Sequence, residues 1–419
     1  MWVNSVTKTF VLFLSLKFLI EEILSKINSR HILKHREQVP HGFEQFIDLP
    51  TYQKSIDYTF SKSKFSSICN GWTFFWDVIF LCSGCLPFLF SILSKYFGFT
   101  IWGQAATLVT VNILLSFLSI PFGWWRQFHL EKNFGFNRST QTIFWTDKIK
   151  GYIVSFLFGL PIISAVVYLF QKFPNSWWIW GWATVMFFQT VMIVIYPLLI
   201  LPLFNKLTPL GDGELKDRLL ELAQLTNFPI NKIYTMDGSK RSAHSNAFFT
   251  GIGKFRHIVL YDTLIQQMTI EEITATLAHE IGHYKHQHIR THLIVEGICT
   301  LCGFGMLYYL SLTNWFLESF GFYAAYEYSL IPLILIFSIA ITGITFWIEP
   351  LLNFLSRKHE YEADQFALKI LGEPEPLISG LRKLHRENLS NLTPHPLFTA
   401  FYYSHPTLLE RESALREKK

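Results

Sequence analysis

Two histidines and a glutamate near the middle of the chain have the types and spacing of a hydrolytic zinc site. They lie in the run Leu-Ala-His279-Glu280-Ile-Gly-His283. The histidines are four positions apart, so on a helix both imidazoles leave the same face and can bind one ion. Glu280 would lie beside the first imidazole and accept a proton from a zinc-activated water. The pattern is short and also occurs by chance, so the rest of the chain must supply a third ligand.

Acidic residues near the C-terminus could provide that third ligand. The segment Ser356-Arg-Lys-His-Glu360-Tyr-Glu-Ala-Asp364 places Glu360 and Asp364 four positions apart on a predicted helix, hence on one face. We expect Glu360 to complete the zinc shell and Asp364 to orient a ligating imidazole. The alternative is an acidic helix face in solvent, which becomes the weaker interpretation beside a metal helix. Glu362 and His359 point to other sides and are not expected to touch the metal.

Two polar stretches must position these residues. The first is predicted to contain a helix at Glu214–Leu225, strands at Lys232–Met236, Ala243–Thr250 and His257–Tyr261, and the metal helix at about 270–289. Thr269 is a plausible N-cap for the metal helix. His286 and His288 lie off its ligand face or beyond reach, so we expect them in solvent. The second polar stretch reads as helices around Arg357–Leu371 and Glu375–Glu387, then a loop and a terminal helix.

The remaining sequence has the composition of a membrane protein. Half of the residues are apolar, 41 are Phe and 13 are Trp, while only 16% are charged. The net charge of +5 comes without a basic block or an RNA-binding aromatic motif, so nucleic acid is not an expected partner. Stretches of about 20 apolar residues predict seven transmembrane helices, at 9–25, 72–96, 100–124, 150–170, 178–204, 291–313 and 329–354.

Charge asymmetry orients these predicted spans in the lipid bilayer. Lys and Arg are concentrated after spans one, three, five and seven, which predicts a lumenal or extracellular N-terminus and cytosolic polar stretches. Charged residues within or beside the spans, such as Glu21 and Glu349, should face protein or water. The expected parts are membrane helices one to five, a catalytic segment, membrane helices six and seven, and a C-terminal helical segment, at 1–204, 205–290, 291–355 and 356–419. The fold class is mainly α, a polytopic membrane protein with seven transmembrane helices and a small α+β domain that carries the candidate zinc site.

Several further segments are similar to one protein family. They are Glu131-Lys-Asn-Phe-Gly135-Phe-Asn137-Arg-Ser-Thr, Ser242-Ala-His-Ser245-Asn246-Ala247-Phe248-Phe249-Thr-Gly251, Arg357–Asp364 and Ser404-His405-Pro406. Together with the zinc motif they resemble the type I CAAX prenyl proteases, the Ste24-like branch of the M48 metalloproteases. The motifs cover most of the chain in the order expected of the family. Glu362 is a departure, because Gln is expected there in relatives.

The resemblance implies roles for residues outside the zinc motif. Asn246, Ala247 and Phe248 would form an edge strand to which a peptide substrate adds as a further strand. The alternative for this segment is an ordinary sheet edge. His405 is similar to the residue that stabilises the oxyanion opposite the metal, a role that suits a hydrogen-bond donor. The alternative for His405 is a helix-capping residue in a C-terminal tail.

The implied reaction is the removal of the last three residues from CaaX proteins whose Cys is prenylated. One zinc ion per chain, bound by His279, His283 and Glu360, would polarise the scissile carbonyl. Glu280 would take a proton from the attacking water and deliver it to the leaving amine. The resemblance further implies that the seven helices enclose a chamber with the zinc near its cytosolic end. The expected location is the endoplasmic reticulum membrane, with the inner nuclear membrane as a second one.

Two other functions remain open at this point. A membrane quality-control zinc protease that cuts misfolded or stalled proteins, independently of prenylation, would use the same catalytic residues. A receptor or transporter with an inactive zinc motif would be insensitive to Glu280→Gln. The sequence leaves open the oligomeric state, the physiological substrate, the choice between farnesyl and geranylgeranyl groups, and the route by which a substrate enters.

Overall fold

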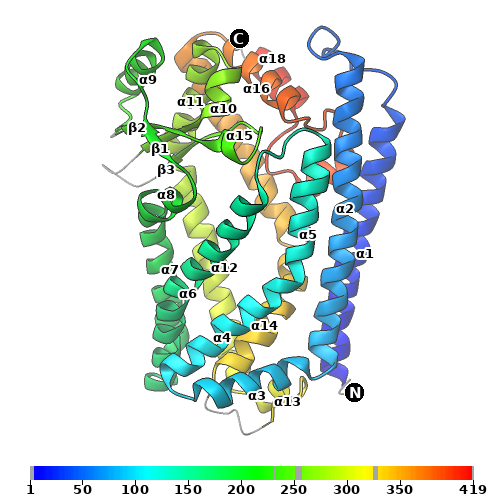
Figure 1. Cartoon of the computed structure of the whole chain (residues 1–419), viewed down its shortest axis with the longest axis vertical. Coiled ribbons are helices and arrows are strands. Elements are labelled where there is room, and N and C mark those ends of the chain that lie inside the picture. The colour runs from blue at the N-terminus through cyan, green and yellow to red at the C-terminus, as the bar shows by residue number, and fades with distance from the viewer. Residues whose placement is uncertain (1–3, 231, 251–256, 324–328, 418–419) are drawn as a thin grey trace.

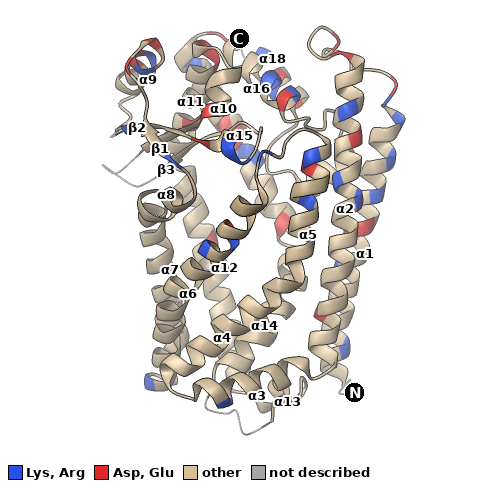
Figure 2. Cartoon of the chain, in the orientation of Figure 1, with Lys and Arg blue, Asp and Glu red and all other residues tan. Residues whose placement is uncertain are grey.

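Long helices dominate the structure, because a backbone without access to water can satisfy its hydrogen bonds within a helix. The computed structural model describes residues 4–230, 232–250, 257–323 and 329–417. Most helices run along the longest axis of the molecule, with the two termini at opposite ends (Figure 1). Charged side chains gather at the end that carries the C-terminus, while the rest of the helices carry few of them (Figure 2). This distribution suits a membrane protein with one polar end.

Within the described ranges, five helical segments are long and apolar enough to cross a membrane. Three of them are single helices: α2 (Leu49–Cys82), α6 (Gln141–Lys172) and α12 (His288–Ser311). The fourth consists of α4 (Ile101–Ser116), η1 (Phe117–Ser119), α5 (Ile120–Trp125) and η2 (Arg126–Glu131) in succession. The fifth consists of α7 (Trp177–Ile195), η3 (Tyr196–Ile200) and α8 (Leu201–Phe204). A sixth span results if α14 (Ile331–Thr345) and α15 (Glu349–Leu371), which meet at a bend of 62°, count as one. The predicted polytopic helical fold is therefore confirmed.

The remaining predicted spans differ in detail from the observed helices. The first predicted span lies within α1 (Ser5–Lys34), which is 30 residues long but more charged than the five segments above. The second predicted span, 72–96, is divided, because α2 ends at Cys82 and α3 (Cys85–Phe97) follows. Gly84 between them has a φ of 77°, a left-handed conformation that glycine adopts without strain. The seventh, 329–354, contains the bend between α14 and α15.

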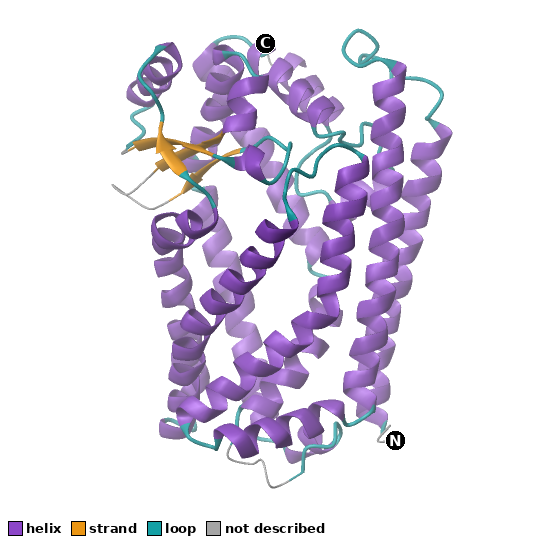
Figure 3. Cartoon of the chain, viewed as in Figure 1, coloured by secondary structure: helices purple, strands orange, loops and turns teal. Residues whose placement is uncertain are grey.

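A four-stranded mixed sheet lies toward the polar end of the molecule (Figure 3). Its strands β1 (Leu207–Pro209), β2 (Lys232–Met236), β3 (Ala247–Thr250) and β4 (His257–Tyr261) have the order β1-β2-β4-β3. β2 pairs with β4 in parallel, and the other two pairs are antiparallel. β3 is thus an edge strand, as expected. Its predicted start at Ala243 is wrong, because the amides of Ala243 and Ser245 are hydrogen-bonded to Phe136 and Asn388 instead of a strand.

The metal helix α11 (Ile270–Lys285) packs with α15, α16 (Glu375–Glu387) and the sheet around one apolar core. Members of this core include Ile258, Leu260, Ile273, Leu277, Ile281, Ala367 and Leu377. Shorter elements complete the chain: α9 (Glu214–Leu225), η4 (Gly238–Lys240), α10 (Asp262–Gln267), α13 (Asn314–Glu318), α17 (Pro396–Tyr402) and α18 (Leu408–Glu417).

Two local features fix α11 against its neighbours. Thr269 and Glu272 form a capping box at its start, and Glu272 also accepts hydrogen bonds from Ser379 and Lys383 of α16, at 2.6 and 2.7 Å. Near its end, Gly282 lets α15 approach closely, since a Cβ atom there would lie 2.9 Å from Cα of Ala363. The backbones of α11 and α15 are therefore in contact where the candidate ligands lie.

Candidate metal centre and active site

The three predicted ligands come together between α11 and α15. Nε2 of His279 and Nε2 of His283 are 3.1 Å apart. Oε2 of Glu360 lies 3.4 Å from Nε2 of His279, and Oε1 of Glu360 lies 3.2 Å from Nε2 of His283. Among the described residues these three form a group able to hold a metal ion. The His279 and Glu360 side chains are 9% and 5% exposed, so the donor atoms are largely withdrawn from bulk water.

The donor set and its spacing fit zinc. Ligand atoms at about 2.0–2.1 Å from a tetrahedral zinc ion are separated by about 3.3 Å, close to all three distances above. Oε2 of Glu360 is buried and has no hydrogen-bond partner among the described residues. A buried carboxylate oxygen without a hydrogen bond is costly, and a bound cation would reduce that cost further than the Arg411 guanidinium, 3.5 Å away, does. Two imidazoles and one carboxylate are also the ligands of catalytic zinc sites, which keep a fourth position open.

Asp364 and Arg411 hold the first ligand in place. Oδ1 of Asp364 lies 2.8 Å from Nδ1 of His279, so the Nδ1–H group of the imidazole donates to the carboxylate and Nε2 is left for the metal. Arg411 of α18 donates to both Asp364 oxygens, at 2.8 and 2.6 Å. Arg411 was not foreseen from the sequence. The only available signal was indirect, since two neighbouring buried carboxylates call for a cation.

A second chain of hydrogen bonds holds the other imidazole ligand. Nδ1 of His283 lies 2.9 Å from Nδ1 of His288, and Nε2 of His288 lies 2.9 Å from Oε2 of Glu362. His288 is 3% exposed, so its expected position in solvent is wrong. His359, which was expected to play no part, is also buried and stacks on the His288 ring at 4.0 Å.

His288, His359 and Glu362 could hold an ion by their types. The hydrogen bonds argue for a different role. With Nε2 of His283 facing the metal position, its Nδ1 carries the proton and donates to Nδ1 of His288. Because Nδ1 of His288 accepts this hydrogen bond, the proton of the neutral His288 imidazole is on Nε2, which donates to Glu362. This group therefore orients a zinc ligand, in the manner of the hydrogen-bonded partners that commonly surround metal-bound histidines.

The metal centre opens into a cavity of about 1090 Å³. The cavity reaches from the metal ligands to α1 and α2, where its lining is mostly polar: Glu21, Ser25, Asn28, Thr59, Lys62, Ser63, Ser66 and Asn70. Glu21 and Glu349, expected to face protein or water, both line it. A water-accessible space thus extends from the metal centre along the long helices.

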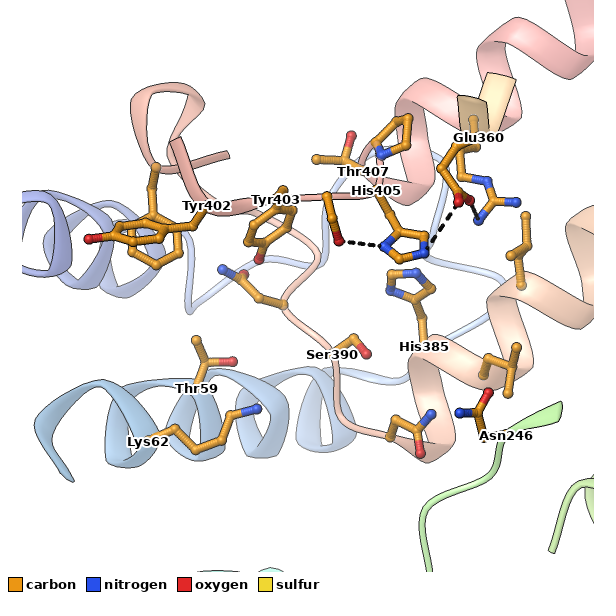
Figure 4. Close-up of a pocket in the computed structure, with 18 of the residues that line it drawn as sticks. Thr59, Lys62, Asn246, Glu360, His385, Ser390, Tyr402, Tyr403, His405 and Thr407 are labelled. Atoms are coloured by element: carbon orange, nitrogen blue, oxygen red, sulfur yellow. Dashed lines mark hydrogen bonds and ion pairs between the residues drawn. The ribbon is translucent and has the colours of Figure 1, made fainter. Parts of the chain in front are cut away.

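The other predicted site residues are divided between two cavities. Glu280, Asn246, Ala247 and His405 line the cavity of the metal ligands, and Figure 4 shows Asn246 and His405 on different sides of it. Phe248 lines a neighbouring cavity of about 640 Å³, and Glu280 and His283 line both cavities. Gly251, the last residue of the edge-strand motif, lies outside the described residues.

The two groups proposed for proton transfer and hydrogen bonding have suitable surroundings. Burial raises the pKa of the Glu280 carboxyl above its usual range, which makes it a stronger base. Nε2 of His405 lies 3.4 Å from Oε1 of Glu360, and its Nδ1 lies 2.9 Å from the Ser404 hydroxyl (Figure 4). His385 of α16, which the sequence did not single out, lies beside His405 in the same view. Burial, with Arg411 and His405 nearby, lowers the pKa of His385 to about 4, so this imidazole is neutral at physiological pH.

Comparison with known proteins agrees with this geometry. Residues 28–206 match the family model "CAAX prenyl protease N-terminal, five membrane helices", and residues 209–419 match "Peptidase family M48". The chain is 34% identical over 408 residues to CAAX prenyl protease 1 of Saccharomyces cerevisiae, covering 90% of this chain and 88% of the relative. It is 31% identical over 446 residues to the Homo sapiens homolog, covering 96% and 93%.

A solved structure is similar throughout. The crystal structure of S. mikatae Ste24p superposes with a TM-score of 0.91 at 32% sequence identity, and the match covers 99% of each chain. Both halves of the chain, the membrane helices and the metal centre, therefore have counterparts in the same proteins. The chain belongs to the CAAX prenyl protease 1 family of M48 zinc metalloproteases and is a multi-pass membrane protein.

Proposed function

We propose that this protein is a membrane zinc endopeptidase that removes the last three residues from prenylated CaaX proteins. The observation that carries the proposal is that His279, His283 and Glu360 line the same cavity as Ala247 of the edge strand and Asn246, which precedes it. Relatives over most of the chain are named CAAX prenyl protease 1. An edge strand binds any peptide through its backbone, and the pockets beside it select side chains.

The two ends of β3 suggest the direction in which a substrate lies. Ser242 and His244, which precede β3 in the chain, line a cavity with cationic side chains. Phe248 and Phe249, within β3, line the 640 Å³ cavity together with Met192, Ile193, Phe228 and Ile289. A CaaX substrate carries its lipid on one side of the scissile bond and its terminal carboxylate on the other. An antiparallel peptide would place the lipid against the apolar cavity and the carboxylate near the cations. Antiparallel pairing is also slightly the more stable arrangement per residue.

The catalytic roles follow from the positions of the side chains. Zinc, when bound by the three ligands, acts as a Lewis acid and lowers the pKa of its water. Glu280 accepts the proton from the attacking water and delivers it to the leaving amine. His405 donates a hydrogen bond to the oxygen of the tetrahedral intermediate. Asp364 and Arg411 keep His279 in the tautomer that leaves Nε2 free.

The location that suits this function is the endoplasmic reticulum membrane, with the inner nuclear membrane as a second one. The catalytic side faces the cytosol, where prenylated proteins are made. The concentration of Lys and Arg in the segments that follow predicted spans one, three, five and seven supports this orientation.

The test is mass spectrometry of two peptides after incubation with purified protein. A farnesylated CaaX peptide should lose its last three residues, and its unmodified twin should be cleaved much more slowly. A chelator should abolish cleavage, and Glu280→Gln should lower the rate by about 10²–10⁴-fold without loss of bound zinc. Equal cleavage of both peptides would instead favour a quality-control protease that ignores prenylation. If Glu280→Gln cleaved the farnesylated peptide as fast as wild type, the proposal of a zinc protease would be refuted.

A further inference from the structure

A second cavity of about 810 Å³ adjoins the active-site cavity, and Lys62, Asn388 and Ser390 line both. This second cavity also contains Ser242 and His244, which precede the first residues of β3. An antiparallel peptide on β3 would therefore run toward it after passing Asn246. The residues shared by the two cavities mark the place where they meet.

The charges of the second cavity favour an anion. Its lining contains the cations Lys62, Arg126, Lys148 and Arg241 but only two carboxylates, those of Glu131 and Asp147. Both carboxylates already have partners. Asp147 binds Arg241 through two hydrogen bonds of 2.9 and 3.0 Å. Glu131 accepts hydrogen bonds from Tyr58 and lies 3.5 Å from His244.

Lys62 is the cation that is best placed between the two cavities. Its ammonium lies 4.3 Å from the centre of the Tyr58 ring, and no ion pair between described residues includes it. Tyr58 is 2% exposed and is fixed by its bonds to Glu131, so the aromatic face positions the lysine. Figure 4 shows Lys62 extending from α2 into the pocket that also contains Asn246 and His385.

We propose that Lys62 binds the terminal carboxylate of the CaaX substrate. The proposal rests on the proposed function and assigns the site that recognises the end of the leaving tripeptide. Three extended residues span about 10 Å, so the carboxylate lies well beyond the metal centre, toward the junction of the two cavities. An ammonium group suits a single terminal carboxylate as a point charge with three donors.

Asn388 adds a neutral partner at the same junction. Its Oδ1 faces Nδ1 of His244 at 3.0 Å and accepts a hydrogen bond from the Ser245 amide at 3.3 Å. The amide N–H groups of Asn388 are thus the part of this side chain left to bind a substrate. The same contacts tie the junction to the residue before Asn246, so the carboxylate site and the edge strand are held in one frame.

The experiment compares two farnesylated CaaX peptides that differ only at the C-terminus, a free acid and a carboxamide. Their kcat/KM values are measured with wild type, Lys62→Met and Lys62→Arg. We expect wild type to prefer the acid by about tenfold, because the amide forfeits the charge-assisted contact. Lys62→Met should lower kcat/KM for the acid by about tenfold and leave the amide unchanged, and Lys62→Arg should restore the preference.

A matched control comes from the same helix. Lys64 stacks on Phe60 at 4.9 Å and lines neither cavity. Lys64→Met should therefore keep the preference for the acid. The proposal is overturned if wild type cleaves acid and amide equally, or if Lys62→Met slows both by the same factor. A wild type that cleaves neither peptide rejects the proposed function itself, and bound zinc with an unchanged unfolding temperature shows that each variant is folded.

Discussion

Replacement of Arg411 tests how the metal centre is organised. Its side chain is 8% exposed and donates to Asp364 at 2.8 and 2.6 Å, and Oε2 of Glu360 lies 3.5 Å from Nη1. One buried cation thus compensates two buried carboxylates. We predict that Arg411→Met, which keeps much of the side-chain length without the charge, weakens zinc binding and destabilises the catalytic region.

The contacts set the size of the effect. Removing one partner of a buried ion pair costs about 3–5 kcal/mol, because the other charge stays buried without compensation. Two charge-assisted hydrogen bonds of about 1.5–3 kcal/mol each give a similar total. Asp364 can escape part of this cost by taking up a proton, but it then supports His279 less well. Loss of such support for a zinc ligand weakens zinc binding by about 10–100-fold.

Zinc affinity is measured by competition with a chromophoric chelator on protein purified in detergent, and unfolding is followed on the same samples by tryptophan fluorescence. A second variant, Arg411→Met with Asp364→Asn, keeps an acceptor for His279 and removes the stranded charge. It should bind zinc more tightly than Arg411→Met alone. The reasoning is refuted if Arg411→Met binds zinc as tightly as wild type, or if adding Asp364→Asn weakens binding further.

Three further predictions concern the neighbours of the metal centre. Gly282→Ala should cost about 1–3 kcal/mol and reduce bound zinc, because its Cβ would push α15 away, whereas Gly303→Ala on α12, with open space around its Cβ, should leave zinc content unchanged. His288→Ala removes the hydrogen-bond partner of the second imidazole ligand and should weaken zinc binding about 10–100-fold in the chelator competition. Burial opposes ionisation of Glu272, but hydrogen bonds from Lys383 and Ser379 lower its pKa. This stabilisation is present above the ordinary pKa of 4.5 and is lost as the pH falls through the lowered value. Lys383→Met should therefore lower the unfolding temperature at pH 7 and have less effect near pH 3; an equal effect at both pH values would contradict this assignment.

The sequence predicted those elements whose pattern is local and regular. The helix Glu214–Leu225 and the strands Lys232–Met236 and His257–Tyr261 have the predicted bounds. The helix has a helical hydrophobic period, and the two strands are short runs rich in β-branched and aromatic residues. The predictions missed changes of direction within apolar stretches, at Gly84 and at the bend between α14 and α15. A hydropathy profile measures the apolar content of a segment and does not show where the helix axis changes direction.

The metal centre was predictable to the extent that its residues are four apart on one helix. His279 with His283, and Glu360 with Asp364, follow this rule. Arg411 was not predictable, because it is 47 residues from its partner Asp364 and only the tertiary fold brings them together. His288 was misassigned for a local reason. The metal helix ends at Lys285, and Gln287, with a left-handed φ of 58°, starts α12 in a direction that brings His288 back to His283.

The metal helix and the helix of the third ligand are adjacent in space but separated along the chain by α12, α13 and α14. During synthesis, His279 and His283 emerge long before Glu360, and the intervening segments must first enter the bilayer. A partly made chain therefore holds at most two of the three ligands. The complete three-ligand set therefore exists only after α15 has been synthesised and has packed against α11.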